Sequence, residues 1–371
     1  MNKKILMIID SLGAGGAEKV ILNLSRTLIN NGHDVSIIII LDRIDYDIDF
    51  DIPIYTLNFE KKKLEPTYLI YAHKLRKLIN KLEKQDKPFD LIVSHLQISH
   101  RLVSLARIPY AYYCIHSSLS PGYILNRKYL RRYLKRRKLK AIFDNQDILA
   151  IAESMATDLI DNVYISPKSI SVINNAIDFS LINNKANEIN PYANENYIIH
   201  IGRFTGFKRH DRLLEAYKKA NISEKLILLG DGELRNAIEH QIDKLGLQDK
   251  VILGGFRQNP YPIIKGAKLT VLSSDYEGLP TVIIESLGLG VPVISTDCPS
   301  GPREILTGQS SNYLVPIDDV AALANKIHDT LAEMKNNPDS YQFPDLSRFS
   351  PENVSQQYLN LANRRERLAD H

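Results

Sequence analysis

The sequence contains only two cysteines and no tryptophan, and it lacks a long apolar run at its amino terminus. Cys114 and Cys298 are too few for a disulfide framework, which indicates a reducing compartment. Lys3 and Lys4 are followed by five apolar residues and then by Asp10, a run too short for a signal peptide or a membrane span. These absences predict a cytoplasmic protein.

A large excess of one charge sign is also absent, since the net charge is only +4 over 371 residues. With 44% apolar and 24% charged residues, the chain is long enough for two domains, each with its own core. The charge is nevertheless uneven. Residues 61–140 hold 20 Lys and Arg against 4 Asp and Glu, a local net charge of +16 that leaves −12 for the remainder.

The most basic part of that region is the segment 127–140. Leu130, Tyr133, Leu134 and Leu139 recur at near-helical spacing among its cations, as in an amphipathic helix that lies on an anionic membrane. A nucleic-acid patch or a solvated helix face are the alternatives. Because no nucleic-acid motif accompanies the segment and because aromatic and leucine residues interrupt it, we expect no nucleic-acid partner. We expect peripheral attachment to the inner face of the plasma membrane.

The stretch from Ser273 to Leu306 carries the strongest local signal. The apolar run 269–272 predicts a buried strand, and the turn Glu277-Gly278-Leu279-Pro280 then leads into a helix that begins at Pro280 or Thr281. The first N–H groups of a helix have no partners within it and carry the positive end of its dipole. The turn is therefore expected to hold a phosphate or a diphosphate, with Gly278 allowing close backbone approach.

Two glutamates of this stretch are candidate ligand-binding residues. Glu277 lies on the turn, and Glu285 lies inside the helix, where it can point back toward the same crevice. Carboxylates there suit the hydroxyls of a sugar or a ribose. The alternative is that Glu277 caps the helix and that Glu285 is a solvated helix residue. The apolar residues around Glu285, however, make its location unfavourable for a charge that has no binding partner.

The pattern S-x-x-E-G-L-P-x-x-x-x-E-S-L-x-x-G-x-P-V-I-S-T-D resembles the signature of the family 4 retaining glycosyltransferases, which have the GT-B fold. The continuation from Cys298 to Glu304 is similar to members that build bacterial surface polysaccharides, such as lipopolysaccharide and capsule, and lipid-linked oligosaccharides. The resemblance covers nearly the whole chain and is strongest over 197–316. It implies two Rossmann-like doubly wound α/β domains that face each other across a cleft.

The resemblance also implies a retaining transfer of a hexosyl unit from a UDP-sugar to a glycan or lipid-linked glycan acceptor. No metal and no cofactor are expected, because the nucleotide sugar is itself the substrate. Glu277 would orient the donor sugar and Glu285 the ribose. A nucleotide-sugar epimerase of the same fold and a non-catalytic binding protein remain alternatives.

The amino-terminal half begins with a strand over 4–9, a glycine turn and a helix. Read as G-x-G-x-x-G from Gly13, the turn places Glu18 where the third glycine of a dinucleotide site belongs, so a dehydrogenase is a poor match. The resemblance favours Gly15 and Gly16 as residues that let a phosphate-bearing donor approach the backbone. Glu18 either meets an acceptor hydroxyl or complements the helix dipole.

Further strands at 91–93, 111–115 and 148–152 alternate with helices, as in a parallel doubly wound sheet. His116 directly follows the second of these, at the edge where ligands bind in such sheets. A structural histidine is the alternative, but the position resembles the family's histidine near the donor sugar. The alternating acids of 45–51 predict an exposed edge segment rather than a metal site.

The second half begins with a strand over 197–201. Gly202, Arg203 and Lys208 follow on a glycine-containing loop, where two cations could clamp a diphosphate, and the resemblance assigns them that role. It likewise places Gly230 near the nucleotide, and Phe256 and Arg257 near the base. His116, Arg203, Lys208 and Glu277 are thus the expected catalytic residues.

The composition of 182–196, rich in Asn, predicts an interdomain linker. We therefore predict an acceptor-binding domain over 1–185 and a nucleotide-sugar-binding domain over 186–350. By resemblance, the helix from about 351 to 371 packs back on the first domain.

Overall fold

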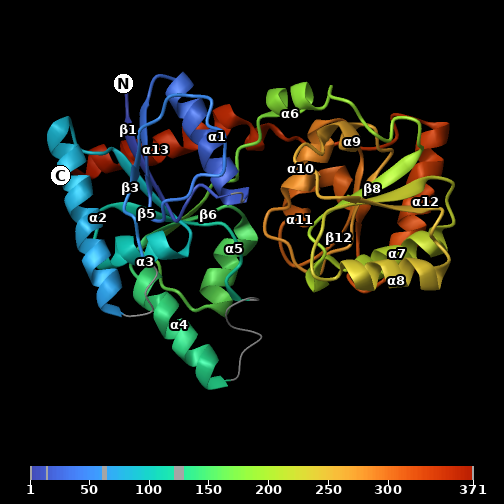
Figure 1. Cartoon of the computed structure of the whole chain (residues 1–371), viewed down its shortest axis with the longest axis horizontal. Coiled ribbons are helices and arrows are strands. Elements are labelled where there is room, and N and C mark those ends of the chain that lie inside the picture. The colour runs from blue at the N-terminus through green and yellow to red at the C-terminus, as the bar shows by residue number, and fades with distance from the viewer. Residues whose placement is uncertain (1, 14–15, 61–64, 121–128, 370–371) are drawn as a thin grey trace. The chain divides into compact units, whose positions relative to one another are not determined.

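The computed structural model describes residues 2–13, 16–60, 65–120 and 129–369, and the chain divides into two compact units (Figure 1). Unit 1 comprises residues 1–176 and 348–371, and unit 2 comprises residues 177–347. Each unit is an α/β domain around one sheet, and every strand pairing in the described residues is parallel. The predicted fold class is confirmed.

Unit 1 contains a seven-stranded sheet in the order β3-β2-β1-β4-β5-β6-β7. All six residues of β1 are buried, because helices cover both faces of a parallel sheet and a strand in its middle must be apolar throughout. The elements of unit 1 are β1 (Lys4–Ile9), α1 (Gly16–Asn30), β2 (Asp34–Ile39), β3 (Ile54–Thr56), α2 (Glu65–Gln85), β4 (Leu91–His95), α3 (Gln97–Ala106), β5 (Ala111–Ile115), α4 (Tyr129–Phe143), β6 (Asp147–Ala150), α5 (Glu153–Thr157), the π-helix η2 (Asp158–Asn162), β7 (Ser169–Val172) and α13 (Pro351–Ala369).

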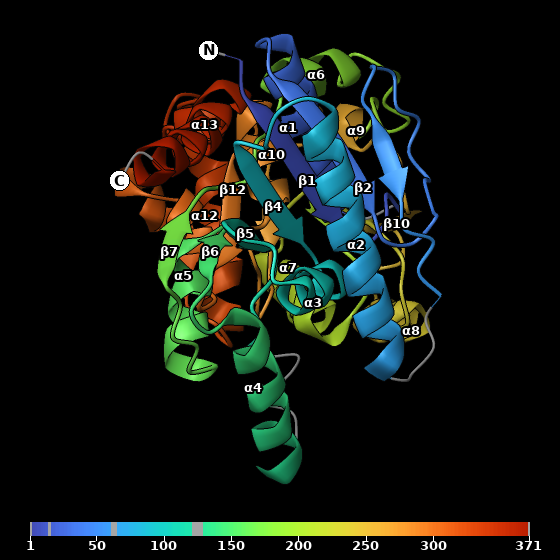
Figure 2. The ribbon, with the colours of Figure 1, turned by 90° about the vertical axis from the view of Figure 1, so that its left-hand side faces the viewer.

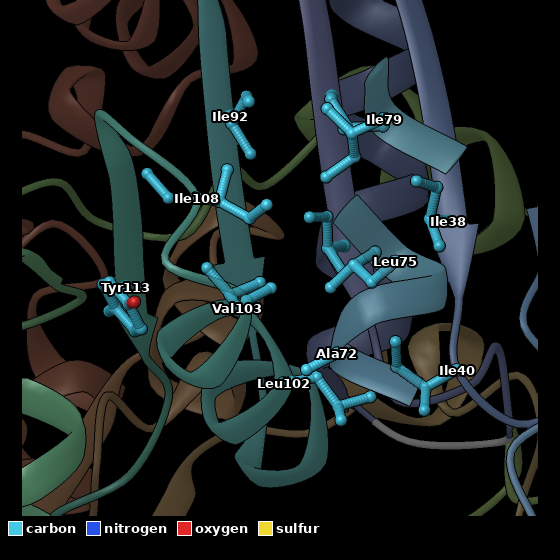
Figure 3. Close-up of a cluster of buried hydrophobic side chains, with 14 of the residues drawn as sticks. Ile38, Ile40, Ala72, Leu75, Ile79, Ile92, Leu102, Val103, Ile108 and Tyr113 are labelled. Atoms are coloured by element: carbon cyan, nitrogen blue, oxygen red, sulfur yellow. The ribbon is translucent and has the colours of Figure 1, made fainter. Parts of the chain in front are cut away.

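One part of the core of unit 1 lies between the sheet and the helices α2 and α3. Figure 3 shows Leu75 and Ile79 of α2, Leu102 and Val103 of α3, and Ile38 of β2 in one cluster, and all five are at most 2% exposed. Burying a side chain of this size contributes roughly 1.5 to 3 kcal/mol. This packing fixes α3 against the carboxyl end of β4, at the edge where His95 and His116 lie.

Unit 2 contains a six-stranded sheet in the order β10-β9-β8-β11-β12-β13. Its elements are α6 (Phe179–Lys185), β8 (Tyr197–Ile201), the 3-10 helix η3 (Gly206–Lys208), α7 (His210–Ala220), β9 (Lys225–Leu229), α8 (Arg235–Leu245), β10 (Val251–Gly255), α9 (Tyr261–Lys265), β11 (Thr270–Leu272), α10 (Thr281–Gly288), β12 (Val293–Thr296), α11 (Pro302–Ile305), η4 (Gly308–Tyr313), β13 (Leu314–Val315) and α12 (Val320–Asn336). A short 3-10 turn, η5 (Ser347–Phe349), then leads into unit 1. As predicted, the helix after the Glu-Gly-Leu-Pro turn begins at Thr281.

The units divide between residues 176 and 177, whereas the sequence placed the boundary at 185/186 and a linker over 182–196. The difference arises because α6 belongs to unit 2. Asp178 caps this helix by accepting a hydrogen bond from the Leu181 N–H at 2.8 Å. The ring of Phe179 then packs on Gly288, where an added Cβ would lie 2.5 Å from the ring.

The carboxy-terminal helix α13 belongs to unit 1, where it packs against α1 and β4. Its buried side chains include Val354, Tyr358 and Leu361, each at most 5% exposed. Tyr358 also forms a hydrogen bond with Cys114 of β5, so the helix reaches the strand that precedes His116. The helix runs to Ala369; the last two residues of the predicted helix lie outside the described part.

The acidic segment 45–51, predicted to be an exposed edge segment with one apolar face, forms no strand. Its acids are exposed and its apolar residues half-buried, as alternation requires, but its backbone does not join the sheet. Ile44 makes one isolated bridge to Leu12, and the edge strand β3 forms only from Ile54 onward.

Helix α4 carries the basic segment and extends away from the rest of unit 1 (Figure 2). Tyr133 and Leu134 are 53% and 48% exposed, whereas Leu139 packs against the core. The side chain of Leu130 and residues 127–128 lie outside the described part. Within the described residues, no helix has both the length and the apolar character needed to span a bilayer.

Candidate functional site

The order of the strands in unit 2 identifies its ligand-binding edge. The chain leaves β8 toward β9 and β10 on one side and returns to β11, β12 and β13 on the other, so the sequence order reverses between β8 and β11. In open α/β sheets, ligands bind outside the carboxyl ends of the strands at this point. The loop after β8 carries Gly202, Arg203 and Lys208, and the loop after β11 carries Glu277.

Lys208 and Glu277 form an ion pair across these two loops, with 2.6 Å between Nζ and Oε1. The side chains are 23% and 9% exposed, so the pair is largely shielded from water. The Ser274 hydroxyl donates a second hydrogen bond to the same oxygen at 2.5 Å. The Ser300 hydroxyl donates to the Glu277 carbonyl. A nearly buried carboxylate is thus fixed beside a cation at the switch point of the sheet.

The turn that follows Glu277 leads directly into α10. Pro280 occupies the N-cap position and its side chain makes no capping hydrogen bond, so the first N–H groups of α10 have no side-chain cap. Gly301, whose φ is +85°, packs against Gly278 and Pro280. A Cβ on Gly301 would lie 2.3 Å from the Gly278 carbonyl oxygen. Leu279 is buried and points away from solvent.

The loop after β8 packs on the loop after β9 through glycines. Gly230 has φ +143°, and an added Cβ would lie 2.0 Å from the carbonyl oxygen of Gly202. A Cβ on Gly232 would lie 2.6 Å from the Phe204 carbonyl oxygen. Close backbone approach therefore sets the position of the loop on which Arg203 lies.

We expect Gly230→Ala to lower the free energy of unfolding of unit 2 by about 2 kcal/mol, since the methyl group would overlap backbone atoms and the φ angle is unfavourable. Chemical denaturation checks the value. Gly206→Ala is the matched control, because no atom lies within 4 Å of its added Cβ. Equal stabilities for the two variants would contradict the close packing of the loops.

The other residues of unit 2 that were predicted to bind the donor make contacts that do not involve Lys208 or Glu277. Arg203 is 76% exposed and its Nε lies 3.8 Å from Glu233 Oε2. Glu285 accepts a hydrogen bond from the Tyr261 hydroxyl at 3.2 Å, and burial, followed by the charge of Glu285, raises the pKa of Tyr261. Phe256 is 78% exposed at the end of β10. Arg257 donates from Nε to the Gly254 carbonyl at 3.2 Å.

A second cationic group in unit 2 was not found by sequence reasoning. The Arg212 side chain is 1% exposed, and it donates to the Ser273 carbonyl at 2.8 Å and to Asp275 at 2.7 Å. Asp318 also accepts from it. The sequence signal that could have identified Arg212 is a basic residue among the apolar positions of α7. The acidic partners of Arg212, however, lie far away in sequence. Arg212 anchors the loop that carries Glu277.

In unit 1, the corresponding edge is formed by the ends of β1, β4 and β5. Gly16 and Glu18 lie at the start of α1, whereas Gly15 is outside the described residues. Burial raises the pKa of Glu18, with a smaller contribution from Asp10. Asp10 accepts hydrogen bonds from the N–H groups of Ile98 and Ser99, at 3.1 and 2.7 Å, and so holds the start of α3 against the end of β1.

His116 lies directly after β5, as predicted, and pairs with a residue that the sequence did not single out. Its Nε2 lies 2.9 Å from Nδ1 of His95, the last residue of β4. Burial lowers the pKa of His116 to about 4, and it lowers the pKa of His95 with help from His116. Within the described residues, the other ring nitrogens of both histidines are buried without a partner. The sequence signal that could have identified this pair is a histidine at the end of each of two neighbouring parallel strands.

Together with Cys114, the two histidines are a group of three potential metal ligands whose ligand atoms lie within 4.8 Å of one another. Burial raises the pKa of the Cys114 thiol to about 12, so the thiol is protonated at neutral pH. Metal binding needs the thiolate. The expectation that the protein needs no metal stays a prediction.

The buried histidines make the stability of unit 1 dependent on pH. The folded pKa of His116 is about 4 against an ordinary 6.5, so between these values the unfolded chain binds a proton that the folded chain does not. Stability is therefore complete above pH 6.5 and falls on acidification, by about 1.4 kcal/mol per pH unit for each such histidine. Urea unfolding between pH 7 and pH 5 should show a smaller slope for His116→Asn. The exposed His240→Asn should keep the full slope.

Two family models match the chain, one after the other. The model described as Glycosyltransferase Family 4 matches residues 14–181, and the model described as Glycosyl transferases group 1 matches residues 182–341. The N-acetylgalactosamine-N,N'-diacetylbacillosaminyl-diphospho-undecaprenol 4-alpha-N-acetylgalactosaminyltransferase of Campylobacter jejuni is 29% identical over 322 residues, 85% of this chain and 87% of the relative.

Two solved structures show the same fold over almost the whole chain. A glycosyltransferase from Rickettsia africae has a TM-score of 0.79 at 18% identity, covering 98% of this chain and 99% of its own. HepE from Anabaena, in complex with UDP and glucose, has a TM-score of 0.70 at 18% identity, covering 99% and 98%. The predicted pair of Rossmann-like domains is the GT-B fold that these proteins share.

Proposed function

The chain belongs to glycosyltransferase family 4, and we propose that it is a retaining enzyme that moves a hexosyl unit from a UDP-sugar to a glycan or lipid-linked glycan acceptor. We place this reaction in the assembly of a bacterial surface polysaccharide. The Campylobacter relative is named for transfer to a diphospho-undecaprenol glycan, and the fold relative HepE binds UDP, which supports both parts of the proposal.

One observation carries the donor half of the proposal, namely the Lys208–Glu277 pair at the switch point, next to the uncapped start of α10. Departure of the nucleotide diphosphate develops negative charge, which fixed cations and helix N–H groups stabilise in the transition state. Lys208, Arg203 and the amides of Gly278 to Pro280 would receive the diphosphate. Glu277 would orient the sugar.

The remaining residues have supporting roles in this proposal. Glu285 would bind the ribose, while Gly202 and Gly230 shape the diphosphate loop, and Phe256 and Arg257 would hold the base. In unit 1, the turn with Gly15 and Gly16 and the residue His116 would contact the donor, and Glu18 an acceptor hydroxyl.

Retention follows from attack on the same face that the leaving group departs from. The acceptor oxygen forms a bond to the anomeric carbon as the bond from that carbon to the diphosphate oxygen breaks. The departing oxygen takes the proton of the acceptor hydroxyl. Since the leaving group serves as the base, no protein nucleophile is assigned.

The experiment that tests the function is acceptor-dependent release of UDP. Thermal unfolding with UDP-glucose, UDP-galactose and their N-acetylated forms should first identify the donor, because a bound ligand raises the melting temperature. Purified protein should then release UDP from that donor only when acceptor is present, and the product should keep the anomeric configuration of the donor. Activity should persist in EDTA.

Other outcomes would favour the alternatives. An epimerase would convert the nucleotide sugar without acceptor, and a binding protein would bind UDP but turn over no donor. A dehydrogenase would bind nicotinamide dinucleotides in calorimetry.

Helix α4 would hold the protein on the membrane where lipid-linked acceptors reside. Each Lys or Arg near an anionic surface contributes on the order of 1 kcal/mol. Sedimentation with phosphatidylglycerol vesicles should therefore capture the protein at low salt. Replacing Arg131 and Arg137, both exposed on α4, with glutamate should reduce that binding.

A further inference from the structure

Unit 1 contains a pocket of about 460 Å³, and His116 is the one residue of its lining that has a role in the reaction proposed above. It lies between α3 and α4, beside the carboxyl ends of β4 and β5. Figure 2 shows α3 at the end of β4, and α3 packs directly on α4. The volume of the pocket falls within the range of about 300 to 1000 Å³ that is typical of ligand sites.

The walls of the pocket are largely apolar. Leu105 of α3, Leu119, and Leu139, Ile142 and Phe143 of α4 contribute to it. A sugar needs a dense set of hydrogen-bonding groups, and leaving its hydroxyls unpaired against such walls would be costly. The lining therefore suits a hydrocarbon chain better than a glycan.

The charges that line the pocket are all of one sign. Arg101, Lys135 and Lys138 contribute side chains, and no acidic residue does so among the described residues. The Arg101 guanidinium is held 3.8 Å from the ring centre of Tyr68, which also lines the pocket. Burial lowers the pKa of His100 to about 3, so this histidine adds no charge at neutral pH. An apolar chain that carries an anionic group matches this combination.

His116 lines the pocket and, in the function proposed above, would contact the donor. An acceptor whose reactive hydroxyl lies near His116 would thus have its anionic group and the start of its chain within reach of the pocket. A long glycan between lipid and reactive sugar would not fit this arrangement, because it would carry the lipid away from His116.

We propose that this pocket binds the phosphate-proximal part of the hydrocarbon chain of a polyprenyl diphosphate-linked acceptor, with the diphosphate against Arg101, Lys135 and Lys138. The proposal rests on the transferase function proposed above, and it narrows the acceptor to a lipid that carries a short glycan.

Direct binding tests the pocket without requiring turnover. The full chain is titrated with farnesyl diphosphate, a water-soluble prenyl diphosphate, while saturating UDP occupies the donor site. We expect saturable binding that Leu105→Asp weakens at least tenfold, because the carboxylate enters an apolar pocket and repels the diphosphate. Ile189→Asp is the matched control, since Ile189 is 92% exposed in unit 2, and it should bind as the unchanged protein does.

A second variant guards against unfolding as the cause of the loss. Ser104→Trp, at a half-buried position of α3 that lines the pocket, should fill it and weaken farnesyl diphosphate binding, with the melting temperature retained. Farnesol and inorganic diphosphate should each bind at least tenfold more weakly than farnesyl diphosphate, because each supplies half of the ligand.

Farnesyl diphosphate binding that neither variant changes would overturn the proposal. So would binding of inorganic diphosphate as tight as that of farnesyl diphosphate, which would indicate a charge site alone. If Leu105→Asp instead abolished sedimentation with anionic vesicles and left farnesyl diphosphate binding intact, the surface would belong to the bilayer contact. Failure of the transferase function is recognised separately, as absence of UDP release with every acceptor.

Discussion

Replacing Lys208 with methionine should reduce kcat/KM for the nucleotide-sugar donor by roughly 100- to 1000-fold, the cost typical of removing one charge-stabilising contact from a transition state. The Lys208 Nζ lies 2.6 Å from Glu277 Oε1, on the loop that follows β8 at the switch point. Methionine retains most of the length of the side chain but removes the cation that would face the departing diphosphate. Steady-state kinetics with the donor identified by thermal unfolding measures the loss.

Two controls separate this effect from a change in folding. Lys218→Met removes an exposed lysine from α7 of the same unit and should leave kcat/KM unchanged. Lys208→Met also leaves the 9% exposed Glu277 side chain without its cation, so Lys208→Met combined with Glu277→Gln should recover stability but not activity. A Lys208→Met enzyme with donor kinetics within threefold of the original would remove Lys208 from the proposed mechanism.

Replacing Arg212 with methionine should lower the free energy of unfolding of unit 2 by about 3 kcal/mol, the lower end of the cost of removing one partner from a buried ion pair. The lower end applies because Asp275, at 27% exposure, still reaches water. The Ser273 carbonyl would also lose its donor at 2.8 Å. The melting temperature should fall by roughly 6 to 12 °C.

The matched control for Arg212 is Asp318→Asn. Asp318 contacts the same guanidinium but its side chain is 74% exposed, so its loss should cost under about 1 kcal/mol. Differential scanning calorimetry distinguishes the two outcomes. Near-equal melting temperatures for the two variants would show that the Arg212 network does not stabilise the loop before Glu277.

The strand ends of unit 2 could be predicted because its strands are short, mostly apolar runs, and β8 and β9 are followed directly by glycine. Such a run is buried on both faces of a parallel sheet, and the residue after it must lie at the carboxyl edge. For this reason the sequence located Lys208 and Glu277 on loops of the same edge, although 69 positions separate them. The contact between them needed the strand order, which places β8 beside β11.

Residues whose roles depend on three-dimensional neighbours could not be predicted in the same way. The role of His95 can be recognised only from the pairing of β4 with β5, which brings Nε2 of His116 within 2.9 Å of Nδ1 of His95. Arg212 interrupts the buried apolar face of α7, and its role is recognised only from its ion pairs with Asp275 and Asp318. The assignment of α6 to unit 2 depends on Gly288, which has no side chain and so leaves room for the Phe179 ring. Local patterns contain none of these contacts.

The position of α13 sets the order in which the protein can be completed during synthesis. Unit 1 consists of two stretches of chain, and the second emerges from the ribosome only after all of unit 2. Domains generally fold as units while the chain is made. Unit 2 can therefore mature first, whereas β5 keeps its Cys114 side uncovered until Tyr358 arrives. The half that carries His116 is thus the last to assemble, although its first strand is the first to be translated.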